Sequence, residues 1–277
     1  MKNKLSIVIV IYNEEKLIRR CLESVKSVAD EIYILHDGPC KDKSLEIAKE
    51  YTSHVFKTKK NYGVPGMILP ILFRKVKSEW ILKMDADEVL STDFAKAIPK
   101  LIQDPEVNAY TVLWPYTDKD KRDITKNWPR KLSLYRKSKM HYLGLPHWDD
   151  PKIDGIIKDT DFVLHHYPPG GCVPTLKVFR EKVLGRYMKL QAEYTLKNFK
   201  DLDQFQYDKE DFPLAFRVRR DFPLITALPF GILAFFRTLF SGGAWKEGRP
   251  VIMEALGTIV YYFSLGLYTY KLKMKAN

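Results

Sequence analysis

Residues 5–15 read LSIVIVIYNEE, an almost unbroken apolar run that ends in an asparagine and two glutamates. Such a run is typical of a strand buried on both faces of a parallel sheet. A signal peptide is the alternative, but the run is short, has no small-residue cleavage site and is closed by polar side chains. The stretch therefore predicts a buried first strand with polar residues at its carboxyl end.

Strand and helix patterns alternate from this strand to residue 102. Repeated β-α units of this kind predict an α/β fold, with a mostly parallel sheet covered by helices on both faces. Ligands of such sheets bind at the carboxyl ends of the strands. Pro70 must lie in the first turn of its helix or kink it. The further strands are expected at 31–35, 55–56 and 80–84, and the helices at 14–28, 43–51, 67–76 and 94–102.

The second half of the chain is less regular. Strands are expected at 109–113 and 131–135, and a long basic helix at 173–199. Residues 222–277 differ in kind, because they hold two apolar blocks joined by a glycine-containing segment. We therefore expect a catalytic domain over residues 1–221 and a helical appendage over residues 222–277.

The charge and the cysteine content indicate which kinds of partner and which cellular compartment suit the chain. The formal net charge of the 277 residues is +12, which suits a polyanionic partner such as nucleic acid, anionic lipid or a phosphorylated substrate. The three cysteines are far apart and odd in number, which argues against a disulfide framework or a zinc site and for a reducing compartment.

An acidic pair directly follows the strand expected at 80–84. Residues 85–88 read DADE, and side chains at i and i+2 of an extended segment point the same way. Asp85 and Asp87 are thus predicted to present two carboxylates to Mn²⁺ or Mg²⁺, which prefer oxygen ligands. Such a metal neutralises charge that develops on a leaving diphosphate. Turn formation and helix capping are the alternative role of an isolated acidic pair.

Two further polar clusters are expected at the same sheet edge. Residues 12–15 (YNEE) follow the first strand, and residues 36–44 (HDGPCKDKS) follow the second. Capping and turn formation again explain Asn13 or Asp37 singly. Three clusters on one edge favour a binding site.

The three clusters together carry a resemblance to a known family. Residues 6–15, 37–44 and 85–88 resemble, in order and spacing, the motifs of family-2 glycosyltransferases with the GT-A fold, and DADE is similar to their metal-binding Asp-X-Asp. The chain looks most like the bacterial subgroup that adds sugars to lipopolysaccharide core or capsule. The resemblance implies a metal-dependent, inverting transfer of a sugar from a nucleotide donor, UDP-linked by expectation, to a glycolipid or surface-polysaccharide acceptor.

The resemblance also implies roles for single residues. Asp37 would accept a hydrogen bond from the donor base, and Asp87 would ligate the metal, with Asp85 on the metal or the ribose. The nucleotide-sugar site is expected to include Tyr12, Asn13, Glu14, Asp37, Asn61, Asp85 and Ala86.

The catalytic base and the last metal ligand are expected in the second half. An inverting transferase needs a carboxylate that deprotonates the acceptor hydroxyl. Residues 145–150 (LPHWDD) offer Asp149 and Asp150 beside an aromatic ring, with Asp149 preferred; a surface turn is the equal alternative. Similar transferases complete the metal shell with a downstream histidine. Here this is His165 or His166, and we assign His165; neighbours in a strand point to opposite sides, so at most one of them fits.

The apolar tail predicts contact with a membrane. Its two blocks, 222–240 and 251–270, are marginal for spanning helices, and the tyrosines and lysines near the end fit the headgroup region. We expect a hairpin in the cytoplasmic leaflet of the plasma (inner) membrane, held peripherally or monotopically, with Arg217, Arg219 and Arg220 facing anionic lipid. The alternative is a soluble helical pair that packs on the catalytic domain or forms a homodimer.

Three other functions are less well supported by the sequence than glycosyl transfer. A sugar nucleotidyltransferase is expected to carry a glycine-rich first loop with basic residues, whereas this loop reads YNEE. A non-catalytic membrane-bound scaffold is disfavoured by the intact Asp37, Asp85 and Asp87. Nucleic acid is not an expected partner, because the basic residues flank apolar helices and not an aromatic stacking surface.

Overall fold

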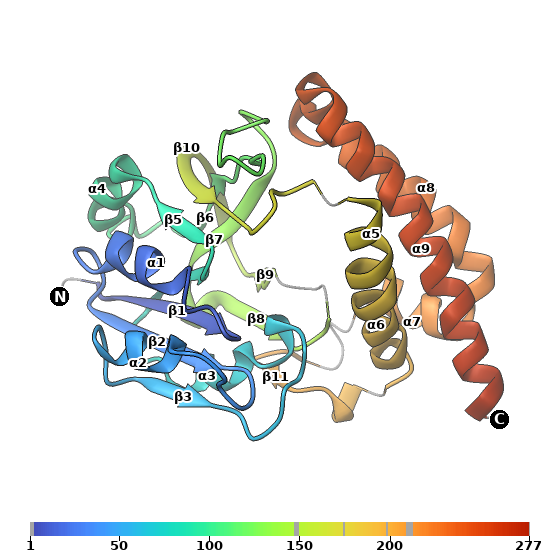
Figure 1. The fold of residues 1–277 in the computed structure, drawn as a ribbon, viewed down its shortest axis with the longest axis horizontal. Helices are drawn as coiled ribbons and strands as arrows, with labels where there is room; N and C mark the ends of the chain where they lie inside the picture. Colours follow the sequence, from blue (N-terminus) through green and yellow to red (C-terminus); the bar gives the residue numbers. More distant parts are fainter. Residues whose placement is uncertain (1–2, 147–149, 174, 198, 209–212, 277) are drawn as a thin grey trace.

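The computed structural model describes residues 3–276 apart from 147–149, 174, 198 and 209–212. An eight-stranded sheet forms its centre, in the order β3-β2-β1-β4-β7-β6-β10-β5 (Figure 1). The strands of this sheet are β1 (Leu5–Ile11), β2 (Glu31–His36), β3 (Val55–Lys57), β4 (Trp80–Asp85), β5 (Glu88–Leu90), β6 (Val107–Leu113), β7 (Arg130–Arg136) and β10 (Ile156–His166).

Parallel and antiparallel pairs divide the sheet. Strands β3, β2, β1 and β4 run parallel, and β6 pairs parallel with β10. Strand β7 is antiparallel to both of its neighbours, and β5 is antiparallel to β10. A smaller sheet contains β11 (Gln204–Phe205), β8 (Met140–Leu143) and β9 (Lys152–Ile153). The fold is thus the predicted mixed α/β architecture with a large, mostly parallel sheet.

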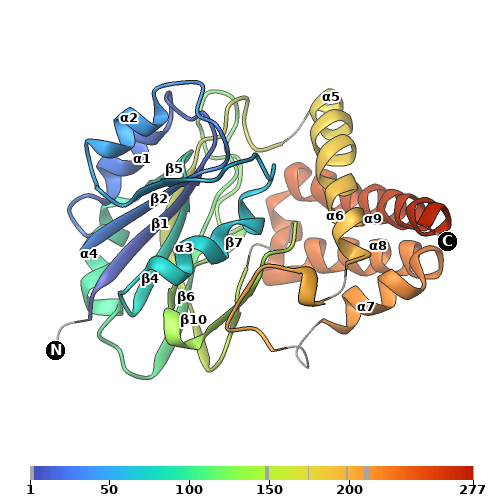
Figure 2. The ribbon, with the colours of Figure 1, turned by 90° about the horizontal axis from the view of Figure 1, so that it is seen from below.

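Helices cover both faces of the sheet (Figure 2). Along β1, Ile7 and Ile9 pack in one core with α1 (Ile18–Val25) and α4 (Thr92–Leu101), whereas Val8 and Val10 pack in a second core with α3 (Leu69–Lys75). The apolar run of β1 is continuous because both of its faces are buried. The other elements of this half are α2 (Ser44–Lys49), η1 (Pro65–Met67) and η2 (Lys137–Lys139).

Of two predictions about helices, the structure confirms one and contradicts the other. Pro70 lies in the first turn of α3, as predicted. The first helix was expected from residue 14 but begins at Ile18. Asn13 has a positive φ of 55°, and the Glu15 amide donates to the Asp42 side chain, so residues 13–15 form a loop tied to the segment after β2.

A helical layer stands beside the sheet (Figure 1). The expected basic helix is continuous from residue 176 to 195, but its middle part, η3 (Phe179–Tyr187), is π-helical between α5 (Leu176–Val178) and α6 (Met188–Thr195). A hairpin of α8 (Pro223–Phe240), the turn η6 (Ser241–Glu247) and α9 (Arg249–Ala276) packs behind it. The remaining short helices are η4 (Phe199–Asp201) and α7 (Leu214–Asp221).

Specific bonds attach the hairpin to the rest of the chain. The Tyr261 hydroxyl donates to the Gln191 side chain of α6 at 2.6 Å. The backbone amides of Lys126 and Asn127 both donate to the Glu247 carboxylate at 2.8 Å, which fixes the hairpin turn to the loop before β7. The expected domain division after residue 221 falls between α7 and α8, and stays a prediction.

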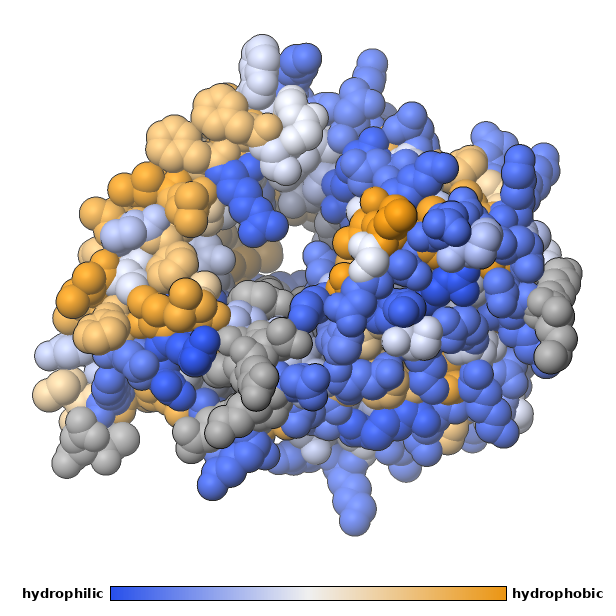
Figure 3. Space-filling view, turned by 180° about the vertical axis from the view of Figure 1, so that it is seen from behind, coloured by the Kyte–Doolittle hydropathy of each residue, from blue (hydrophilic) through white to orange (hydrophobic). Residues whose placement is uncertain are grey.

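The hairpin exposes much of its apolar surface. The segments Pro223–Glu247 and Arg249–Lys275 are long and apolar enough to cross a membrane by length and composition, and only 17% and 22% of an apolar 18-residue window within each is buried. Seen from behind, this side of the molecule is predominantly apolar, in contrast to the polar surface of the sheet domain (Figure 3). Arg219 was expected to face lipid but is buried, with its guanidinium over the rings of Phe230 and Tyr262.

Candidate active site at the carboxyl ends of the parallel strands

The three polar clusters meet at one edge of the sheet. Ile11 lies beside His36 in the β1–β2 register, and Val10 lies beside Asp85 in the β1–β4 register. Parallel strands end at the same edge, so the segments that follow β1, β2 and β4 are neighbours in space. The predicted juxtaposition of these segments is present.

The loop after β1 is held by hydrogen bonds to the loop after β2. The Asn13 amide donates to His36 Nε2, and its side-chain oxygen accepts from the Lys41 amide at 2.9 Å. The Glu14 amide donates to Ser44 Oγ at 2.6 Å. The Asn13 side chain therefore stabilises the conformation of the loop. Tyr12 is 39% exposed, so its ring is accessible to a ligand.

Asp37 anchors a third loop from inside. Its side chain is almost fully buried and accepts from the backbone amides of Tyr62 and Gly63 at 2.8 and 2.9 Å. The Asn61 side chain donates to the Asp37 carbonyl. Gly38 is required beneath this loop, because it has a φ of 87° and a Cβ there would lie 2.7 Å from the Asn61 nitrogen. The nucleotide contacts predicted for Asp37 and Asn61 stay predictions.

Lys131 of β7 stands between the acidic residues after β4. Its ammonium lies 2.9 Å from Asp85 Oδ2 and also bonds Glu88 Oε1. Glu88 is fully buried and accepts from the Asp85 amide at 2.8 Å and from the Trp114 indole at 2.6 Å. Glu88 therefore fixes the backbone of the acidic motif from the buried side. The Asp85 side chain is 36% exposed and faces the site.

These contacts set the ionisation of the acidic cluster. Burial works to raise the pKa of Asp85, but the positive charges of Lys131 and then Lys83 outweigh it and hold that pKa below its usual range. Burial raises the pKa of Glu88. Sequence inspection missed Lys131, because a lysine in the alternating stretch RKLSLYR at residues 130–136 carries no sign of the strand opposite it.

His166, and not His165, faces Asp87. His166 Nε2 lies 3.5 Å from Asp87 Oδ2, and its ring stacks on Trp114 with centroids 3.9 Å apart. His165 points to the other side of β10, where its ring stacks on Tyr167. The structure thus places His166 beside Asp87, and not the predicted His165, since consecutive side chains of a strand alternate between faces; metal ligation by a histidine stays a prediction.

The pKa of His166 leads to a stability prediction. Burial alone would lower this pKa, but the bonds to Asp87 and the Cys172 thiol raise it to about 9. A raised histidine pKa gives stabilisation that is complete below pH 6.5 and lost as the pH rises through 9. In EDTA, the difference in unfolding free energy between wild type and His166→Asn should therefore shrink over this range by up to about 3 kcal/mol. Denaturant titrations at several pH values measure it.

His165→Asn is the matched control for this titration. Its ring does not contact Asp87, so its difference from wild type should not follow the same curve. A pH-independent difference for His166→Asn would contradict the ion pair with Asp87.

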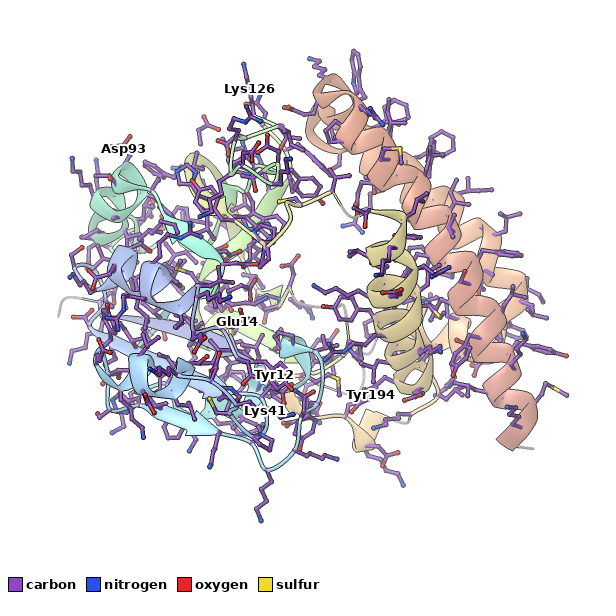
Figure 4. All side chains as sticks on the ribbon, in the orientation of Figure 1. Tyr12, Glu14, Lys41, Asp93, Lys126 and Tyr194 are labelled. Carbon is purple, nitrogen blue, oxygen red and sulfur yellow. The ribbon has the colours of Figure 1, made fainter. Side chains whose placement is uncertain are left out.

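Glu14 faces the space between the sheet and η3 (Figure 4). Burial, and then the negative charges of Asp87 and Asp42, raise the pKa of Glu14 to about 7, whereas Lys182 of η3 acts in the opposite direction. Glu14 is thus near both the acidic motif and the basic helix. On the same side, a Cβ on Gly63 would lie 3.1 Å from the Arg186 guanidinium, so η3 closes over these loops.

The remaining predicted residues are Ala86, within the acidic motif, and the two candidate bases, Asp149 and Asp150. Ala86 is buried between the two aspartates. Asp149, with His147 and Trp148, lies outside the described residues. Asp150 is exposed, and its charge adds to burial in raising the pKa of Tyr135 on β7. The role of Asp149 or Asp150 as the base stays a prediction.

The donor set fits a hard divalent cation. Asp85 Oδ1 and Asp87 Oδ1 have no hydrogen-bond partner in the described part of the chain, and both side chains are partly exposed. Lys131 compensates one negative charge of the cluster, and Asp87 Oδ2 faces His166. Two carboxylates and an imidazole suit Mn²⁺ and are compatible with Mg²⁺ when phosphate oxygens and water complete the shell.

Comparisons with known proteins identify the family of the chain. Residues 6–187 match the family model described as Glycosyl transferase family 2. The chain is 31% identical over 110 residues to an uncharacterized glycosyltransferase of Rickettsia bellii, and 29% identical over 173 residues to the SPbeta prophage-derived glycosyltransferase SunS of Bacillus subtilis. The matches cover 40% and 62% of this chain but only 36% and 38% of those relatives.

A solved structure resembles most of the chain. It is S. aureus TarS 1-349 in complex with UDP-GlcNAc, with a TM-score of 0.47 and 16% identity over 92% of this chain and 90% of that one.

Proposed function

Because this chain belongs to glycosyl transferase family 2, we propose that it transfers a sugar from a nucleotide-sugar donor to an acceptor at a membrane surface. The observation that carries the proposal is the meeting of Asp85, Asp87 and His166 with the loops after β1 and β2 at one sheet edge. Both the diphosphate and the nucleoside of a donor can be held there, since acidic metal ligands and ordered loops adjoin.

Asp85, Asp87 and His166 are the proposed metal ligands. A bound Mn²⁺ or Mg²⁺ supplies positive charge opposite the leaving diphosphate. Lys131 keeps Asp85 ionised, and Glu88 fixes the backbone of the motif through the Asp85 amide. These two residues position the ligands without themselves meeting the donor.

The donor nucleoside is proposed to lie against Tyr12 and the segment 61–63. Tyr12 offers an exposed ring for stacking. The proposed role of Asp37 is to position the segment 61–63, because its carboxylate already accepts hydrogen bonds from two backbone amides of that segment. A UDP-linked sugar and inversion at the anomeric carbon, with Asp149 or Asp150 as the base, complete the proposal.

The acceptor is proposed to be a glycolipid or a lipid-linked glycan at the cytoplasmic face of the inner membrane. The exposed apolar face of the hairpin supports this, because large exposed apolar areas on proteins mark contacts with membranes or partners. Arg217, Lys271 and Lys275 lie near this face and are exposed, and each adds roughly 1 kcal/mol at an anionic surface.

A donor panel tests the proposal. Purified protein in detergent is titrated with UDP- and GDP-linked sugars in Mn²⁺, Mg²⁺ or EDTA, and binding is followed by calorimetry and hydrolysis by nucleotide release. One donor class should bind in the presence of metal and lose most of its affinity in EDTA. If no nucleotide sugar binds in any condition, the proposal fails and a non-catalytic scaffold takes its place.

A further inference from the structure

An apolar groove of about 500 Å³ separates the basic helix from the hairpin. Phe179, Val183 and Tyr187 line it from η3, and Met253, Leu256 and Val260 line it from α9. Volumes of this size hold drug-sized ligands or a lipid chain.

One acidic side chain interrupts the apolar lining. Glu254 of α9 lines the groove, and within the described ranges no hydrogen bond or ion pair is formed by its carboxylate. By contrast, two other polar side chains that line the groove, Gln191 and Tyr261, form a hydrogen bond with each other. A carboxylate facing an apolar groove costs free energy unless a donor reaches it, so the occupant is expected to bring hydroxyl groups to this point.

The Glu254 end of the groove leads toward the active site. Glu247, in the turn before α9, holds the backbone of Lys126 and Asn127, and the neighbouring Trp128 ring lies 5.0 Å from the Tyr116 ring, centroid to centroid. The Tyr116 ring lies 6.2 Å from Trp114, which stacks on His166, the partner of Asp87. A wall of aromatic rings therefore connects the groove to the acidic motif, and such rings are suited to contact with sugar faces.

We propose that this groove binds the hydrocarbon chain of a glycolipid acceptor, with the sugar head group at Glu254 and Tyr116 and directed along the aromatic wall toward Asp87. The inference rests on the proposed function and names where its acceptor binds. The groove is continuous with the exposed apolar face of α8 and α9. The hydrocarbon chain of the lipid can therefore enter the groove sideways from a bilayer, while its sugar head group stays in the polar site.

Gly257 offers a way to fill the groove without disturbing the helix. It lies within α9 on the groove wall, and a Cβ there would be in ordinary contact with the Phe179 ring at 3.5 Å. Gly257→Ala therefore fits and favours the helix, whereas Gly257→Phe occupies the space that a lipid chain would take. Comparing the two variants separates the effect of filling the groove from the effect of replacing the glycine.

Photocrosslinking in vesicles tests the inference without requiring catalysis. Glucosyl diacylglycerol and phosphatidylcholine, each with a diazirine in one acyl chain, are placed in otherwise identical vesicles with the full chain. Crosslinks to residues 179–187 and 253–260 are counted by mass spectrometry against those to the outer face of α8. The glucosyl lipid should label the groove roughly tenfold more than phosphatidylcholine, since only it donates hydrogen bonds to Glu254.

The variants and the donor assay separate the possible failures. Gly257→Phe should abolish labelling of the groove, Gly257→Ala should keep it, and both should bind nucleotide sugar as wild type does. Equal labelling of the groove by both lipids, or none while α8 is labelled and the donor still binds, would overturn the groove assignment alone. Loss of donor binding in wild type would overturn the proposed function instead.

Discussion

Asp87→Asn is expected to lower kcat/KM for sugar transfer by roughly 10²- to 10³-fold. The amide keeps the size of the side chain but removes the negative charge that faces His166, 3.5 Å away, and that is proposed to bind the metal. Metal affinity should fall with activity, so titration of Mn²⁺ in the presence of donor is measured beside the rate. A higher metal concentration should restore part of the lost rate.

Asp93→Asn is the matched control for this substitution. Asp93 is exposed in the first turn of α4, away from the site (Figure 4), and the same chemical change there should leave rate and metal affinity unchanged. Full metal-dependent activity in Asp87→Asn would exclude this carboxylate from the metal site and remove the main support for the proposed mechanism.

Lys131→Met is expected to lower the free energy of unfolding by about 3 to 5 kcal/mol at neutral pH. The Lys131 side chain is 11% exposed and its ammonium pairs with Asp85 and the fully buried Glu88, so its loss leaves two close carboxylates without their shared cation. In variants that stay folded, affinity for a divalent cation should rise, because a competing positive charge has left Asp85. Denaturant unfolding and metal titration measure the two effects.

Two further variants make the Lys131 result specific. Lys96→Met, at an exposed site on α4, should change the unfolding free energy by less than about 0.5 kcal/mol. Glu88→Gln combined with Lys131→Met should recover part of the loss, and the double-mutant cycle gives the coupling energy. Additive losses in that cycle would show that the Lys131–Glu88 contact contributes little.

The parallel half of the fold was predictable because its signals are local. The apolar runs of β1, β2 and β4 and the apolar spacing of α1 and α4 are properties of short segments, and the structure confirms each of them. The start of α1 was wrong by four residues, because hydrogen bonds to Ser44 and Asp42 compete with the helix for residues 14 and 15. Short strands such as β5 and β8 escaped notice, since three or four residues carry little periodicity.

The candidate site was predictable only in outline. The order of Asp37, Asp85 and Asp87 along the chain was enough to place them at one sheet edge, because parallel strands end together. The choice between His165 and His166 needed the phase of β10, which neighbouring identical residues cannot reveal. Lys131 on β7 and Trp114, directly after β6, reach Asp85 and Glu88 from more than twenty residues away, and no local pattern marks such contacts.

The sequence by itself determined the α/β architecture, the acidic motif and the apolar tail, because each depends on side chains that are close along the chain. The tertiary structure decided which charges meet and which surfaces enclose space. It placed Lys131 against Asp85 and Glu88, turned His166 toward Asp87, committed Asp37 to the backbone of residues 62 and 63, and left Glu254 in a groove between η3 and α9. These features arise from contacts between distant segments, whose geometry is set only when the whole core packs.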